Sequence, residues 1–226
     1  RAHLLGTNDV GQDLLSELIF GVRISLTIGF LAATVSISIG TLVGVVAGYF
    51  GGWVDAVLMR LVDVILVVPF LPLMILLAAY LGPSFWNIIL VIGILVWARP
   101  ARVIRAQVLS LKSLDFVDAA RALGVSSGRI LRRHVLPGVL SLSLAQFILA
   151  AGTAILIEAS LSFLGLGAQP PTPEWGGMLN DSRPYFQVGP SLMLYPGLAI
   201  MLAVLSFNLL GDGLRDVLDP RGVTRR

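Results

Sequence analysis

Five long apolar stretches, separated by polar segments, divide this chain. They cover about residues 22–48, 55–81, 85–108, 135–163 and 191–211. Each is at least as long as the roughly 20 apolar residues that a helix needs to cross a bilayer. An open sheet would leave unpaired backbone groups in lipid, so helices are the expected elements. The pattern therefore predicts a single all-α domain over residues 1–226, a polytopic transmembrane helical bundle.

A glycine stripe marks one face of the first span. Gly40, Gly44, Gly48 and Gly52 recur every four residues, so this face carries no side chains. A neighbouring helix can approach such a stripe closely. We expect a helix-packing surface here rather than a ligand site.

Two prolines, Pro69 and Pro72, lie in the middle of the second span. They should kink or locally unwind it, because proline lacks a backbone N–H and clashes with the preceding turn. Such breaks are tolerated at membrane depth where the backbone lines a cavity or is buried by neighbours. Both prolines are therefore candidate pathway residues. Pro100 predicts a further kink near the end of the third span.

Polar residues within the spans supply the other pathway candidates. Gln146 and Glu158 are the polar members of the fourth span. Glu158 lies about 30 Å along the helix axis from Pro137, so we expect it near the far surface, lining an entrance or emerging into water. Arg60 and Asp63 are three residues apart in the second span and can pair on one helical face.

Composition and charge indicate the class and the orientation. The 226 residues are 56% hydrophobic and 13% charged, with a mean hydropathy of +0.89, far from a soluble average. Basic residues concentrate between Arg99 and Arg133 and in the C-terminal tail. Such clusters mark cytoplasmic segments. We therefore expect residues 109–134 and the C-terminus in the cytoplasm, and residues 1–20 and 165–190 outside.

Several details follow from this topology. The chain begins with Arg1, and an external first segment requires an earlier crossing, so we expect a sixth, N-terminal span upstream. Arg99, Arg102 and Arg105 lie in the last turns of the third span, where long basic side chains can reach the lipid headgroups. The net charge of +3 is not arranged as a basic face with interleaved aromatics, which excludes nucleic acid as the expected partner.

No metal site is expected. The sequence has no cysteine, so disulfides and thiolate ligands are excluded. Asn8, Asp9 and Asp13 do not have the spacing of an EF-hand loop. They predict instead a surface turn in which Asn8 or Asp9 caps a short helix through Ser16.

A short amphipathic helix is predicted over residues 113–124. Phe116, Ala119, Ala120 and Leu123 fall at i, i+3, i+4 and i+7 and so share one helical face. Gly124 stands where a left-handed residue would end the helix. From the residues alone, this face could lie on the membrane, pack against its own bundle or contact another protein.

The ends of this helix also have candidate residues. Ser113 or Asp115 can cap its start, and Asp118 suits its positive N-terminal end. Ser126 or Ser127 can cap a second helix that leads into the fourth span.

The same stretch resembles the EAA signature of ABC-transporter permeases. The letters DAA at 118–120, G at 124 and LP at 136–137 have the spacing of that signature. Asp118 keeps the charge of the usual glutamate, and His134 stands where isoleucine is usual.

Further motifs extend the resemblance over nearly the whole chain. They are LGTNDVGQDLLSELIFGVRISL (5–26), GAQPPTPEWG (167–176) and FNLLGDGLRDVLDP (207–220). All are similar to the dipeptide/oligopeptide/nickel family of inner-membrane ABC permeases, and most similar to the C-type dipeptide subunits, which pair with a second permease. Gln12 and Glu17 stand where this family often has arginine.

The resemblance implies a type I ABC importer permease of the bacterial inner membrane. It implies a heterodimer with a second, homologous permease, two cytoplasmic ATPase subunits and an external solute-binding protein. ATP and Mg would be held by the ATPases, with no cofactor in this chain, which lacks a GxxxxGK[ST] phosphate loop. The pair of permeases would form the path for di- and oligopeptides.

The resemblance also assigns roles to residues. The helix at 113–124 would be a coupling helix seated on an ATPase, with the contact residues Phe116, Asp118, Ala119, Ala120, Leu123 and Gly124. The Pro- and Gly-rich loop at 165–190 would face the binding protein, with the contact residues Gln169, Pro170, Pro171, Glu174 and Trp175.

Three other functions are weighed against peptide import. The same architecture could carry nickel or another small solute. An intramembrane enzyme would need a buried nucleophile and base, but His3 and His134 lie outside the spans and no GxSxG or HExxH motif occurs. A channel or a purely structural subunit would have no use for a capped, alanine-centred cytoplasmic helix.

Overall fold

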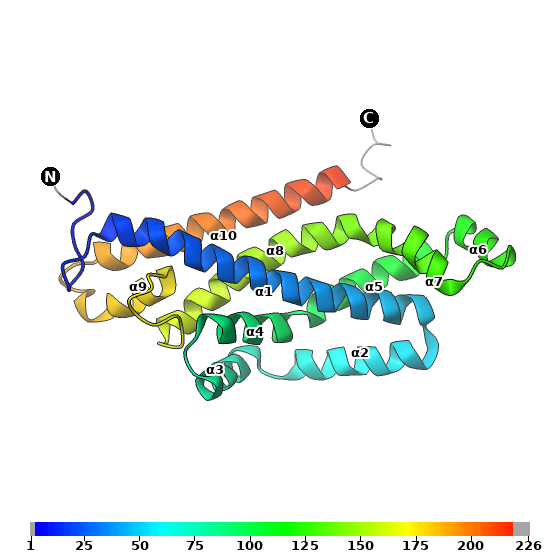
Figure 1. Cartoon of the computed structure of the whole chain (residues 1–226), viewed down its shortest axis with the longest axis horizontal. Helices are drawn as coiled ribbons and strands as arrows, with labels where there is room; N and C mark the ends of the chain where they lie inside the picture. The colour runs from blue at the N-terminus through cyan, green and yellow to red at the C-terminus, as the bar shows by residue number, and fades with distance from the viewer. Residues whose placement is uncertain (1–2, 219–226) are drawn as a thin grey trace.

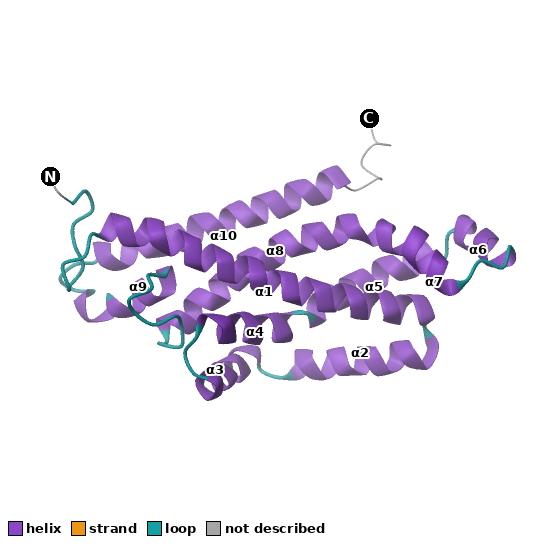
Figure 2. Cartoon of the chain, viewed as in Figure 1, coloured by secondary structure: helices purple, strands orange, loops and turns teal. Residues whose placement is uncertain are grey.

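The computed structural model describes residues 3–218 and confirms the all-α class (Figure 2). Among these residues no strand forms, and the only extended pairing is the isolated bridge between Thr7 and Asp13. The α-helices are α1 (Leu14–Phe50), α2 (Gly52–Val67), α3 (Phe70–Leu81), α4 (Phe85–Val96), α5 (Ala98–Lys112), α6 (Asp115–Ala122), α7 (Ser127–Ile130), α8 (Leu136–Phe163), α9 (Trp175–Asp181) and α10 (Ser191–Leu218). A π-helical turn (Leu131–Val135) joins α7 to α8, and a 3₁₀ turn (Arg183–Tyr185) follows α9.

The bundle is elongated, and most helices run along its long axis (Figure 1). The long helix α1 packs against α4 and α5 on one side and against α8 on another, and α8 in turn packs against α10. The short helix α6 lies at one end of the bundle, whereas α9 and the N-terminal loop lie at the opposite end. The two ends are therefore separated by the full length of the spans.

The glycine stripe of α1 packs closely against α5, as predicted. A Cβ atom on Gly44 would stand 2.6 Å from the carbonyl oxygen of Ala101, and one on Gly48 would stand 2.8 Å from Val108 Cβ. Gly40 approaches Pro100 and the backbone of Trp97 in the same way. Gly52 is not part of this contact.

Two of the predicted spans are bent pairs of helices. The axes of α2 and α3 differ by 86°, and those of α4 and α5 by 42°. The first break falls at Val68, which is extended because the Pro69 ring disfavours helical backbone in the residue before it. Pro72 lies in the first turn of α3, where the missing N–H costs nothing. The second break falls just before Pro100, which cannot donate to the carbonyl of Val96.

Within residues 3–218, three helices are long and apolar enough to cross a membrane alone, and up to five spans result if each bent pair counts as one. Their boundaries differ from the prediction at three places. Helix α1 begins at Leu14 because Asp13, rather than Asn8 or Asp9, is its N-cap, with Asp13 Oδ2 accepting a hydrogen bond from Ser16 N at 2.9 Å. Asn8 Oδ1 instead accepts a hydrogen bond from the backbone N–H of Gln12, which closes a turn before α1.

The other two differences lengthen the fourth and fifth spans. Helix begins at Ser127 and continues through the π-helical turn into α8; Ser126 is the N-cap residue, but its side chain makes no capping bond. Helix α10 continues to Leu218, so the charged segment after residue 211 is part of the last span's helix. Asp219 and the arginines that follow lie outside the described residues.

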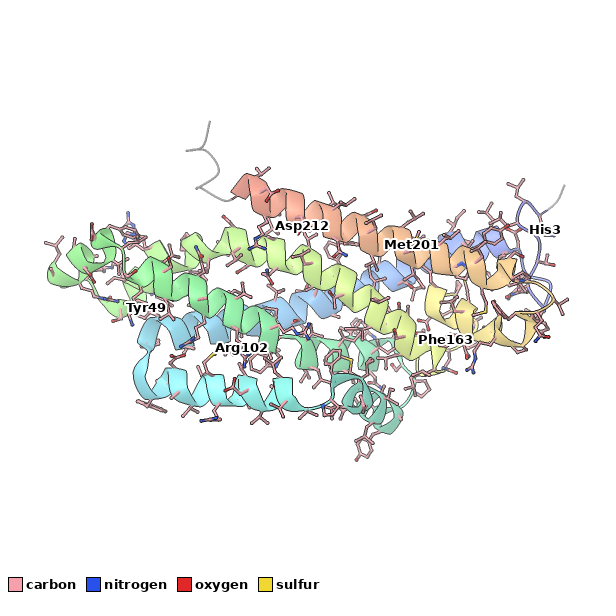
Figure 3. The ribbon with its side chains drawn as sticks, turned by 180° about the vertical axis from the view of Figure 1, so that it is seen from behind. His3, Tyr49, Arg102, Phe163, Met201 and Asp212 are labelled. Carbon is pink, nitrogen blue, oxygen red and sulfur yellow. The ribbon has the colours of Figure 1, made fainter. Side chains whose placement is uncertain are left out.

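The charged residues of the second span pair across helices rather than within one. Arg102 on α5 bonds Asp63, so Asp63 does not pair with Arg60, and Figure 3 shows Arg102 between α5 and α2. Arg105 Nη2 donates to Asp55 Oδ2 at 2.6 Å. The sequence did not predict that these two arginines pair with acidic residues of another helix. Two acidic residues on α2 hold them at the α2–α5 contact.

Candidate functional site

The short helix predicted over residues 113–124 forms as α6, over Asp115–Ala122, and ends as the sequence indicates. Gly124 has φ +75°, a left-handed conformation that glycine adopts without strain. Its N–H donates to the Arg121 carbonyl at 2.9 Å, and the Val125 N–H donates to the Ala120 carbonyl at 3.1 Å. These two bonds form a Schellman motif.

The start of α6 differs from the prediction. Leu114 occupies the N-cap position, and no side chain caps the helix. Ser113 Oγ donates instead to the carbonyl oxygen of Ser110, at the end of α5. Asp115 and Asp118 both lie in the first turn, where negative charge suits the helix dipole.

One residue that the sequence pattern missed anchors α6 to the bundle. Val117 is 0% exposed and packs in a cluster with Tyr49, Val108 and Ile130. Ala120 is partly buried against the same cluster. A single valine outside the i, i+3, i+4, i+7 set gave no periodic signal, so the sequence did not reveal this contact.

The rest of the predicted face stays in solvent. Phe116 is 48% exposed and Leu123 is 84% exposed, and Ala119 and Gly124 are also exposed. Asp118 Oδ1 accepts a hydrogen bond from Arg121 Nη1 at 3.1 Å, a surface pair three residues apart. Packing against the bundle therefore uses Val117 and Ala120, and leaves an apolar face of the kind that marks interaction sites.

A cavity of about 220 Å³ lies among the middle helices. Gln146 and Thr153 of α8 line it together with Arg99, and so do Val68 and Phe70, which flank the break at Pro69. Pro69 and Pro72 themselves are exposed and do not line it. Of the predicted pathway residues, the structure thus brings Gln146 to this cavity and adds Arg99, which the sequence pattern assigned to the headgroups rather than to the pathway.

Glu158 lies near the end of α8, as predicted, but its surroundings differ from the prediction. Its side chain is fully buried, so it does not emerge into water, and it does not line the central cavity. Its Oε1 accepts a hydrogen bond from Ser162 Oγ at 3.1 Å, while Oε2 has no partner. The distance along the helix axis correctly predicted that Glu158 lies near one end of α8. At that end, however, the 165–190 segment covers its side chain.

The loop at 165–190 also buries two residues that we expected on its surface. Glu174 is 2% exposed and Trp175 is 4% exposed. Trp175 Nε1 donates to the carbonyl oxygen of Leu18, which ties the loop to α1 at 3.1 Å. Of the predicted contact residues, Gln169, Pro170 and Pro171 are the exposed ones.

The segments 1–20 and 165–190, which were predicted to lie on the same side of the membrane, are in contact with each other. Tyr185 OH and Asp9 Oδ2 are 3.3 Å apart, which joins the end of the loop to the N-terminal segment. Both lie at the end of the bundle opposite α6 (Figure 1). The relative placement of these segments agrees with the topology inferred from charge.

Comparison with known proteins identifies the family. Residues 40–222 match the model for the binding-protein-dependent transport system inner membrane component. The chain belongs to this family. The match includes α6, the 167–176 motif and the 207–220 motif, and it confirms the resemblance that these motifs carry.

Relatives of this permease family match almost the whole chain. It is 46% identical over 219 residues to the dipeptide transport system permease protein DppC of Alkalihalophilus pseudofirmus, covering 97% of this chain and 72% of the relative. It is 44% identical over 220 residues to the glutathione transport system permease protein GsiD of Pectobacterium atrosepticum, covering 97% and 73%. The chain is accordingly a membrane permease component of a transport system and not itself an enzyme.

Solved structures of ABC transporters share the fold. The inward-facing MetNI methionine ABC transporter aligns with a TM-score of 0.67 and 19% identity, covering 90% of this chain and 97% of that chain. An amino acid ABC transporter aligns with a TM-score of 0.63, also at 19% identity, covering 90% and 95%. These alignments confirm the ABC importer permease fold.

Proposed function

We propose that this permease carries di- or oligopeptides inward, as one half of a heterodimer with a second, homologous permease. Its relatives are named for dipeptide and glutathione transport, and glutathione is itself a small peptide. The partner permease would supply the other wall of the path, in which the cavity around Gln146 and Arg99 takes part.

Energy reaches this chain from two cytoplasmic ATPase subunits, which hold ATP and Mg; no cofactor binds to the chain itself. The observation that carries the proposal is α6: a helix fixed to the bundle by Val117 yet exposing Phe116, Ala119 and Leu123. One face of such a helix is free to dock on a partner, while another face is packed on the bundle. Movement of the partner is therefore transmitted through the helix to the bundle. When the ATPases close on ATP, α6 moves with them and shifts α5 and the helix that leads into α8.

The orientation follows from the same arrangement. Residues 109–134 and the C-terminus face the cytoplasm of a bacterium, and residues 1–20 and 165–190 lie outside its inner membrane. Basic residues flank α6, as the positive-inside rule requires. The exposed part of the loop, with Gln169, Pro170 and Pro171, meets the external solute-binding protein.

Import of nickel or another small solute by the same architecture is the alternative. Among residues 3–218, no group of three His, Asp or Glu side chains is arranged to hold a metal ion. The peptide proposal is favoured by the names of the relatives rather than by any residue of the pathway.

Uptake by the reconstituted transporter distinguishes the two substrates. Proteoliposomes holding both permeases and the ATPases, with ATP inside and the binding protein outside, should accumulate a labelled dipeptide and not ⁶³Ni²⁺. The ligand that mass spectrometry finds on the purified binding protein should be a peptide. Accumulation of nickel without the dipeptide would contradict the proposal.

A further inference from the structure

A cavity of about 680 Å³ opens at the end of the bundle opposite α6. Its walls come from the N-terminal segment, from the loop after α8 and from α9. Cavities of roughly this size bind small molecules and the side chains of partners. Exposed residues at its edge include Val10, Gln12 and Gln169.

The cavity is acidic. Four carboxyl-bearing residues line it, and no described lining residue is basic: Asp9, Glu17, Glu174 and Asp181. Among the basic residues near this end, Arg23 lines a separate hollow on the other side of Thr172 and Pro173. Arg183 lies over the Phe163 ring at 5.1 Å, and His3 Nδ1 is 3.1 Å from Asp13 Oδ1.

Glu174 distinguishes this cavity from an ordinary acidic surface. Glu174 is among the residues that line the cavity and is 2% exposed, and neither of its carboxyl oxygens accepts a hydrogen bond of normal geometry, although Ser162 and the backbone of Ala168 lie close enough to favour the ionised form. Glycine at position 167 leaves the room that the carboxyl needs, since a Cβ there would stand 1.9 Å from Glu174 Oε1. The buried carboxyl of Glu158 interacts with that of Glu174, and its Oε2 is the third carboxyl oxygen here that lacks a hydrogen bond of normal geometry.

Two adjacent buried carboxyl groups cannot both carry a negative charge without a large cost, so this arrangement requires a proton or a cation. Burial raises the pKa of Glu174, which favours the protonated form while the cavity is empty. A cation that enters would favour the ionised form instead. The absence of a three-ligand metal group among residues 3–218 points away from a metal ion. A guanidinium or an ammonium group, which bonds carboxylates directly, fits the donor set better.

We propose that this acidic cavity receives one basic side chain, arginine or lysine, presented by the external solute-binding protein when it docks. The inference rests on the proposed function, which places this end of the bundle outside and in contact with that protein. The exposed residues Gln169, Pro170 and Pro171 stand at the cavity's edge, so a docking protein would cover it. The Glu174 carboxylate is then the specific contact, and the prolines form the surface around it.

The test measures how much binding protein is needed for half-maximal stimulation of ATPase activity in the complete transporter. E174Q removes the charge and keeps the shape, and should raise that concentration by at least about tenfold, because it leaves the incoming cation without its buried partner. Gln12→Glu adds charge at the edge while keeping the oxygen that accepts from Asn8, and should lower the concentration about twofold to threefold.

Thermal unfolding of the same variants separates docking from a structural role. E174Q should melt at or above the temperature of the unaltered permease, since it replaces a buried carboxyl that accepts no hydrogen bond of normal geometry. A marked fall in melting temperature would show that Glu174 only holds the loop together, and would overturn the proposal.

Three further outcomes overturn it in different ways. If the binding protein stimulates the unaltered transporter but E174Q and Gln12→Glu shift the concentration by less than about twofold, the cavity is not the docking contact, while the importer function stands. If free arginine amide stabilises the permease through Glu174 without affecting docking, the occupant is a small cation. If no binding protein stimulates the unaltered transporter, the proposed function itself fails.

Discussion

The two ends of the bundle hold their motif residues in opposite ways. At the α6 end, Phe116 and Leu123 project from a helix that one buried valine anchors. At the other end, the 165–190 loop buries Glu174 and Trp175 and exposes Pro170 and Pro171. The motif at the first end presents a surface, whereas the motif at the second end builds a cavity. Similarity of sequence to a family therefore does not by itself say which motif residues touch a partner.

A substitution on the exposed face of α6 should have the largest effect on transport. Leu123→Asp places a charge at a residue that is 84% exposed, so folding is unaffected, but docking on an ATPase would bury that charge without a partner. We expect dipeptide import to fall by at least about tenfold. Leu123→Met, which keeps volume and polarity, is the matched control and should retain import. Normal import by Leu123→Asp would remove the reason for assigning α6 to an ATPase.

Ala120 and Gly124 are less suitable for this test. A larger residue at Ala120 would press on the cluster around Val117, and any side chain at Gly124 would be strained at φ +75°. Loss of activity in such variants would combine misfolding of α6 with loss of docking.

The anchor of α6 should give a smaller, local effect. Val117→Ala removes two methyl groups from a fully buried site, which should lower the local free energy of unfolding by about 1–3 kcal/mol. Hydrogen exchange of the α6 amides should then accelerate, while exchange in α9 stays unchanged. Ala119→Ser, on the exposed face, serves as the control. Unchanged protection of α6 in Val117→Ala would show that another contact holds the helix.

The cavity end should show the smallest effect, as a dependence of stability on pH. Burial raises the pKa of Glu174 above its ordinary value of 4.5, so the folded protein binds this proton more tightly than the unfolded chain does. The contribution of Glu174 to stability is therefore present at low pH and declines as the pH rises through the raised pKa. Melting temperatures of E174Q should fall less with rising pH than those of the unaltered permease. Parallel curves would mean that Glu174 is not desolvated as the structure shows.

Features that depend on local pattern could be predicted from the sequence. Apolar runs gave the spans, and the four-residue glycine spacing gave the close contact of α1 with α5. Pro69 and Pro100 gave the two bends, because each removes a donor that a straight helix needs. Gly124 predicted the end of α6, because glycine adopts the left-handed backbone conformation there without strain.

Features that depend on tertiary contact could not be predicted in this way. Asp63 pairs with Arg102 across two helices, 39 residues apart in the chain, rather than with its neighbour Arg60. Val117 is buried only because Tyr49 and Val108 lie over it. The position of Glu158 along α8 was predicted, but not the loop that covers it. The surroundings of each of these residues are formed by segments that are distant from it in the sequence.

Site-directed cross-linking from α6 tests the central claim most directly. The sequence has no cysteine, so Leu123→Cys and Gln169→Cys each carry a single thiol at opposite ends of the bundle. In the assembled transporter, Leu123→Cys should cross-link to an ATPase subunit, with a yield that changes on ATP binding, and Gln169→Cys should not. In intact cells, a membrane-impermeant maleimide should label Gln169→Cys alone. Labelling of Leu123→Cys from outside, or its failure to cross-link to an ATPase in an active transporter, would contradict the account.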